Sequence, residues 1–121
     1  MRWVIAAALA FPLSAHSAPP EVGSDDWNIM EPFAQWVMTQ HAENGNWCCD
    51  VSDGRPVDAR INAAGRWEAH VTSEHWPTAR DHWVEVPDAR VLHTANPVGV
   101  AIMWYSVPAD HVYCFAPAGG V

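Results

Sequence analysis

The chain has 121 residues, half of them hydrophobic, so it can bury one modest core and has no room for a second independent domain. All six basic side chains are arginines, fourteen residues are acidic, and the formal net charge is −8 with neutral histidines. Because such a chain repels nucleic acid and anionic lipid, we expect neither as a partner. Eight tryptophans are many for this length, and we expect some in the core and some exposed.

The first residues have the pattern of a secretory signal peptide. Met1-Arg2 gives a positive start, residues 3–11 are apolar, and small residues follow as far as Ala18. This pattern predicts a signal peptide over residues 1–18, cleaved between residues 15 and 18, and a periplasmic or secreted protein. The apolar run is shorter than the roughly 20 residues of a transmembrane helix, so we expect no membrane span after cleavage.

One helix is predicted near the start of the mature chain. Residues 19–30 are polar and predict a flexible lead-in, and the spacing of apolar residues predicts a helix over 31–43. Pro32 suits its first turn, and Asn44-Gly45 is a typical stop. Trp36 and Val37 would form its buried stripe.

From residue 46 onward the apolar period is two, which is typical of strands. Residues 98–107 are apolar on both faces and predict the central, most buried strand. Residues 73–81 predict a loop. The expected strands cover residues 57–62, 66–72, 82–86, 90–92, 98–107 and 111–116.

These elements predict an α+β, mainly β fold. We expect one N-terminal helix packed on a small antiparallel meander or an SH3-like, partly open barrel; a two-layer sheet with the helix across it is the alternative. The single globular domain would cover residues 31–117, and residues 118–121 would be a frayed tail.

Several short motifs, taken in order, carry a resemblance to a known family. They are Cys48-Cys49-Asp50-Val51-Ser52-Asp53-Gly54, Trp83-Val84-Glu85-Val86-Pro87, Asn96-Pro97-Val98-Gly99-Val100-Ala101, Trp104 and Cys114-Phe115-Ala116-Pro117. Over residues 30–120 the chain resembles small exported proteins of Gram-negative bacteria whose function is uncharacterised. The resemblance implies an exported single domain with a double cysteine and a late cysteine.

The three cysteines predict one disulfide, because an exported protein folds in an oxidising compartment. We favour Cys49 with Cys114, and Cys48 is the alternative partner. The loop of about 65 residues would stabilise the fold by about 4 kcal/mol in the chain-entropy account. The third thiol would be buried and inert, would join two chains in a disulfide dimer, or would react or bind metal.

The motifs predict no catalytic site and no cofactor, since neither a GxSxG elbow nor HExxH, HxH or CxxC spacing is present. We therefore expect a non-enzymatic binding or interaction domain for an envelope component, either a glycan or a protein. Exposed Trp47 and Trp76 would stack on that ligand. The alternative is a copper or zinc protein, or a thiol-redox protein, that uses the double cysteine and histidines. Its metal ligands would be Cys48, His75, His82 and His111.

Overall fold

A computed structural model describes residues 20–40 and 54–119. The predicted leader and the segment with Trp47, Cys48 and Cys49 lie outside this part of the chain. Among the helices of the described residues, none is both long and apolar enough to cross a membrane.

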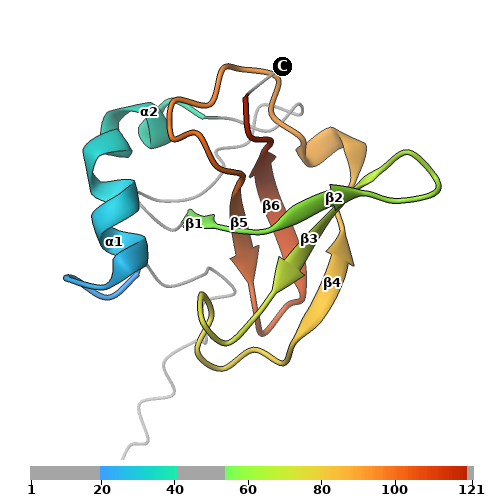
Figure 1. Cartoon of the computed structure of the whole chain (residues 1–121), viewed down its shortest axis with the longest axis horizontal. Coiled ribbons are helices and arrows are strands. Elements are labelled where there is room, and N and C mark those ends of the chain that lie inside the picture. Colours follow the sequence, from blue (N-terminus) through green and yellow to red (C-terminus); the bar gives the residue numbers. More distant parts are fainter. Residues whose placement is uncertain (1–19, 41–53, 120–121) are drawn as a thin grey trace, which may run out of the picture.

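The N-terminal helical segment is broken into three short pieces (Figure 1). They are α1 (Asp25–Met30), the 3-10 turn η1 (Glu31–Phe33) and α2 (Ala34–Met38). The Ser24 hydroxyl caps α1 by accepting a hydrogen bond from Trp27 N–H at 3.3 Å. Because Pro32 has no N–H to give to an α-helical turn, the chain tightens into η1 at this point.

The predicted boundary between lead-in and helix was therefore wrong. Residues 25–30 are helical, and Met30 is buried. The Ser24 cap and the acidic side chains of the first turn start α1 ahead of the proline. α2 ends at Met38, where the Thr39 hydroxyl donates to the Trp36 carbonyl at 2.8 Å. The predicted stop at Asn44-Gly45 lies outside the described residues.

Within residues 20–40 and 54–119, six short strands form two antiparallel three-stranded sheets. The first sheet has the order β1-β5-β6 and consists of β1 (Arg55–Pro56), β5 (Ile102–Ser106) and β6 (His111–Ala116). The second has the order β2-β3-β4 and consists of β2 (Ala59–Ile61), β3 (Trp67–Val71) and β4 (His82–Glu85). After β4 the chain makes the 3-10 turn η2 (Asp88–Arg90), and Val91 forms a parallel bridge with Phe115.

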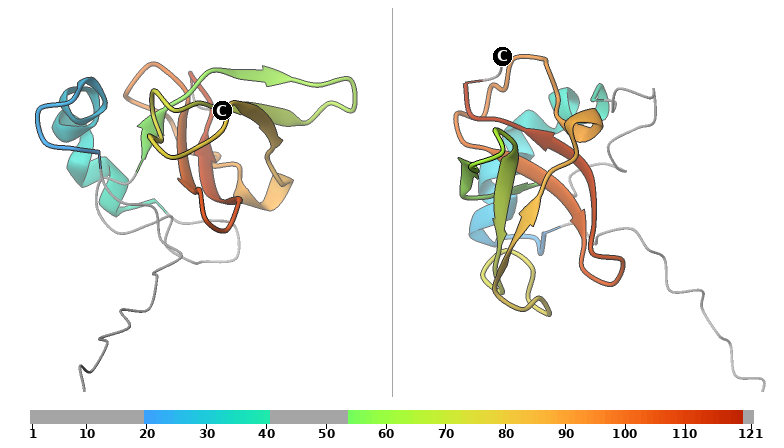
Figure 2. Two further views of the ribbon diagram at one scale, coloured as in Figure 1. Left: turned by 90° about the horizontal axis from the view of Figure 1, so that it is seen from below. Right: turned by 90° about the vertical axis from the view of Figure 1, so that its right-hand side faces the viewer.

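The β1-β5-β6 sheet is the middle layer of the molecule, with the helices on one side and the other sheet on the opposite side (Figures 1 and 2). Alternate residues of a strand face opposite ways, so β5 and β6 contribute to two cores. The core under the helices includes Met30, Val37, Ile102, Trp104 and Cys114. The core between the sheets includes Ala69, Val71, Met103, Tyr105 and Phe115. Every residue of β5 is buried, which confirms the predicted central strand.

The predicted α+β, mainly β class is confirmed, and the described residues contain no closed barrel. The expected strand at 90–92 is instead η2 followed by the single bridge at Val91. The central strand begins at Ile102, later than predicted. Residues 96–100 form a turn ahead of β5. Asn96 holds this turn, since its Nδ2 donates to the Val100 carbonyl at 2.7 Å.

Candidate functional site

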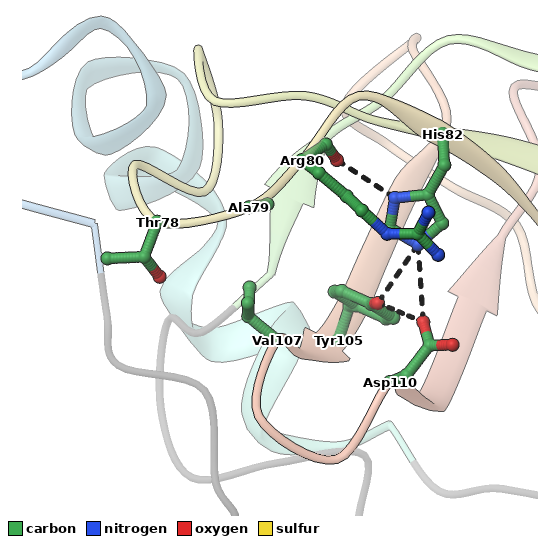
Figure 3. Close-up of a pocket in the computed structure, with 7 residues that line it drawn as sticks. All are labelled: Thr78, Ala79, Arg80, His82, Tyr105, Val107 and Asp110. Carbon is green, nitrogen blue, oxygen red and sulfur yellow. Dashed lines mark hydrogen bonds and ion pairs between the residues drawn. The ribbon is translucent and has the colours of Figure 1, made fainter.

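A cleft opens where the loop after β3, the first residue of β4 and the β5–β6 turn come together (Figure 3). Its volume of about 310 Å³ falls in the range of small-molecule sites. The lining residues are Thr78, Ala79, Arg80, His82, Tyr105, Val107 and Asp110. The sheets position two of the polar residues, because His82 starts β4 and Tyr105 lies near the end of β5.

His82, Tyr105 and Asp110 form a hydrogen-bonded triangle in this cleft (Figure 3). The Tyr105 hydroxyl donates to Asp110 Oδ1. A carbonyl only accepts, so the 2.8 Å bond from His82 Nδ1 to the Arg80 carbonyl places a proton on Nδ1. His82 Nε2 is then directed at Asp110 Oδ1, 3.3 Å away, and at the Tyr105 hydroxyl oxygen, 3.4 Å away. Protonated His82 donates to both Asp110 and the Arg80 carbonyl.

The environment keeps Asp110 ionised and Tyr105 protonated. The hydrogen bonds from Tyr105, chiefly, and from His82 hold the pKa of the Asp110 carboxyl below its usual range. Burial, chiefly, and the bond to Asp110 raise the pKa of the Tyr105 phenol. The triangle therefore presents a carboxylate whose Oδ1 is already held by neighbouring donors.

Arg80 supplies a permanent positive charge to the cleft. Its side chain is exposed, and no carboxylate of the described residues forms an ion pair with it. Its charge contributes a small further lowering of the Asp110 pKa. A guanidinium offers a planar set of donors that matches a carboxylate or phosphate in two parallel hydrogen bonds. Arg80 can thus bind an anionic group that enters the cleft.

A second hollow, of about 390 Å³, continues from this cleft along β4. Both hollows are lined by Arg80, His82 and Asp110, so these residues lie where the two meet. The second hollow runs between β4 and the start of β6, and Pro87 lies at its other end. Its remaining lining residues are Trp83, Val84, Glu85, His111 and Val112.

His75 lies at a different place in the molecule. Its Nδ1 donates to both carboxylate oxygens of Asp26 at 2.9 Å, which ties the loop after β3 to α1. A separate hollow of about 310 Å³ beside this pair is lined by residues of α1, its N-terminal approach and the loop after β3, and by Arg55 of β1. His75 therefore has a structural partner away from the Arg80 cleft.

The histidines predicted as metal ligands do not form one site. His82 and His111 line the same hollow, but His111 packs edge-on against Tyr113 at 4.7 Å between ring centroids. Across residues 20–40 and 54–119, no group of three His, Cys, Asp or Glu side chains could hold a metal ion. A copper or zinc site that includes Cys48 falls outside the described residues and stays a prediction.

Trp76 does not offer an exposed face, so its assignment as a stacking platform was wrong. Only 2% of the residue is exposed, because the loop turns the indole inward to meet the Tyr105 ring edge-on at 5.6 Å. Trp83 lies nearer the surface, but His70 stacks on it at 4.6 Å and the Arg60 guanidinium lies 3.8 Å from its centroid. Trp47, the other predicted platform, lies outside the described residues.

The structure describes only one of the cysteines of the predicted disulfide. Cys114 lies on β6 opposite Trp104 and is completely buried. Cys48 and Cys49, its candidate partners, lie outside the described residues. The bond and the choice between the two partners stay predictions.

The comparisons with known proteins name no relative: no protein-family model, no curated protein and no solved structure matches the chain. Function must therefore be argued from the cleft itself. Sequence reasoning singled out His82 as a metal candidate and missed Arg80, Tyr105 and Asp110. The available signals were a tyrosine at the end of a buried strand and an aspartate closing the Pro108-Ala109-Asp110 turn.

Proposed function

We propose that the chain is an exported, non-enzymatic binding domain that holds a polar, carboxylate-bearing ligand at Arg80. The observation that carries this proposal is the meeting of two hollows at Arg80, His82 and Asp110. Export rests on the leader pattern of residues 1–18. A periplasmic or secreted binding domain would find its ligand among envelope or extracellular molecules.

The exposed guanidinium of Arg80 favours a ligand that carries a carboxylate. Arg80 is exposed and has no ion pair with a described carboxylate, whereas Oδ1 of Asp110 already accepts a hydrogen bond from the Tyr105 hydroxyl. A ligand carboxylate would thus face the guanidinium. Ala79 and Val107 supply apolar walls for the rest of the ligand, and the Thr78 hydroxyl can donate or accept.

Binding of small carboxylates tests the proposal directly. The probes are acetylated amino acids and sugar acids, each compared with its neutral amide or ester, and binding is followed by ligand-observed NMR. Losing a charge-assisted bond of about 1.5–3 kcal/mol corresponds to a loss of roughly 10- to 150-fold in affinity. We expect the acids to bind the wild type and to bind Arg80→Ala at least about tenfold more weakly.

Arg90→Ala is the matched control, because Arg90 lies in η2 and lines neither of the two hollows at Arg80. It removes the same charge from the same acidic protein and should leave binding within about twofold. Equal losses in the two variants would show a general charge effect and contradict the proposal. So would binding that Arg80→Ala leaves unchanged.

A further inference from the structure

The hollow along β4 lies between two strand edges. β4 is the outer strand of the β2-β3-β4 sheet, and β6 is the outer strand of the β1-β5-β6 sheet. Val91 and Leu92 cover the far end of the β6 edge, where Leu92 N–H donates to the Phe115 carbonyl at 2.8 Å. No described strand covers β4 on the side away from β3.

The register shows which backbone groups of β4 remain available. In an antiparallel pair, alternate residues direct their N–H and C=O toward the partner strand. Val86 N–H donates to the Trp67 carbonyl at 2.8 Å. Val84 and His82 follow at steps of two residues, so they also direct their backbone groups toward their partners Ala69 and Val71 on β3. Trp83 and Glu85 therefore direct their backbone N–H and C=O groups away from β3. The free edge of β4 therefore offers two backbone donors and two backbone acceptors. An added strand of three or four residues can pair with this number of groups.

The hollow admits a single segment better than another sheet. β6 and the β5–β6 turn line it opposite β4, through Asp110, His111 and Val112. The edge of a whole sheet from a second copy would meet these residues before it reached β4. An extended peptide needs only the width of one strand, about 4.8 Å on each side.

The charge at the start of β4 sets the direction of such a peptide. Arg80 and His82 lie at the N-terminal end of β4, and Arg80 has no described carboxylate partner. A peptide antiparallel to β4 ends where β4 begins, so its C-terminal carboxylate would reach Arg80. Glu85, at the other end, already accepts from Arg66 at 3.0 Å and from Asn62 at 3.1 Å.

We infer that the ligand of the Arg80 cleft is the C-terminal segment of a protein, whose last three or four residues add an antiparallel strand to β4. This inference rests on the proposed function and specifies its ligand. Main-chain hydrogen bonds to Trp83 and Glu85 would supply affinity, and the bond from Arg80 to the terminal carboxylate would select a chain end.

The test uses an acetylated tetrapeptide of alternating threonine and valine with a free C-terminal carboxylate. Amide NMR of the full mature chain measures its affinity, and two doubly N-methylated forms carry the methyl groups on alternate residues. Removing the N–H groups that face β4 should weaken binding at least about tenfold, whereas methylating the other two should change it by less than about twofold. The C-terminal amide and Arg80→Ala should each lose about tenfold or more.

Equal effects of the two N-methylated forms would overturn the strand register. If the tetrapeptide fails to bind while small carboxylates still need Arg80, the peptide inference is wrong and the proposed function stands. If neither binds, both fail. Sedimentation of the free protein supplies the last check. A dimer that dissociates in Trp83→Glu, whose side chain lies on the face of β4 away from the core, but persists in the control Val22→Glu would assign this edge to a second copy and overturn the inference. Circular dichroism should show that both variants keep the wild-type fold.

Discussion

Asp110 shapes the cleft through both its backbone and its side chain. Its φ of 47° lies in the left-handed region, which aspartate and asparagine accept more readily than other non-glycine residues. This conformation turns the chain between β5 and β6 and brings the carboxylate to His82 and Tyr105. Asparagine at this position would keep the backbone preference and remove only the charge.

Asp110→Asn should lower the free energy of unfolding by less than about 1 kcal/mol at neutral pH, because the carboxylate is largely exposed. The folded pKa of Asp110 is depressed, so its contribution is present above the unfolded pKa of about 3.9 and is lost as the pH falls through the folded pKa. Urea unfolding at about pH 7 and about pH 2 should show a smaller difference between the two proteins at the lower pH. A difference of the same size at both would contradict this account.

Tyr105→Phe removes one oxygen and keeps the buried ring. Because Asp110 loses its main donor, we expect its pKa to rise toward the usual range, and stability to fall by about 0.5–1.5 kcal/mol. NMR titration of the Asp110 carboxyl carbon measures the first effect. Tyr113→Phe, on the neighbouring strand, is the control. An unchanged Asp110 titration in Tyr105→Phe would show that the hydroxyl does not hold the carboxylate.

At the scale of elements, β1 is held close to β5 by the absence of a side chain at Gly54. A Cβ there would lie 2.8 Å from Trp104 Cε2 and 2.9 Å from Ile102 Cγ2. Both atoms belong to buried residues of the central strand, which have little freedom to move. Glycine at this position is thus required by close packing.

Gly54→Ala should destabilise the protein by about 1–3 kcal/mol through overpacking. The control is Gly65→Asn in the turn between β2 and β3. Nothing lies within 4 Å of a Cβ at Gly65, and asparagine tolerates its φ of 79°, so the change should stay within about 0.5 kcal/mol. Chemical unfolding of both variants gives the comparison. Similar losses in the two would refute a specific clash at Gly54.

Much of this element structure was predictable, because period-two alternation follows directly from one-sided burial. In β3, Ala69 and Val71 are buried as expected, whereas Glu68 and His70 face the other way. The helix start was missed because Ser24 and Asp25 are equally common in loops and at caps. The cleft was missed because His82 meets Asp110 only through the packing of one sheet on the other, which no local pattern encodes.

At the scale of the whole molecule, the layers depend on the β5–β6 pair, which contributes to both cores. Cys114 lies in the core under the helices, completely buried. A bond from Cys114 to Cys49 or Cys48 would fix this core to the segment that follows the helices. A small exported domain buries a limited apolar area, and a disulfide of this kind would add to its stability.

If the predicted disulfide forms, only one of the three cysteines should alkylate in the unfolded, unreduced protein. Peptide mapping would then identify Cys49 or Cys48 as the partner of Cys114. Replacing that partner by alanine should lower stability by about 4 kcal/mol, and replacing the remaining cysteine should have a much smaller effect. Alkylation of all three cysteines without reductant would exclude the bond.

The claim that the Arg80 cleft is the ligand site is tested most directly by amide NMR of the mature protein with the free-acid tetrapeptide and the small carboxylates. The account predicts that the perturbed amides cluster at residues 78–85 and 105–112, and that Arg80→Ala removes these changes. Changes centred on Arg60, Glu68 and His70, on α1, or nowhere at all would contradict it.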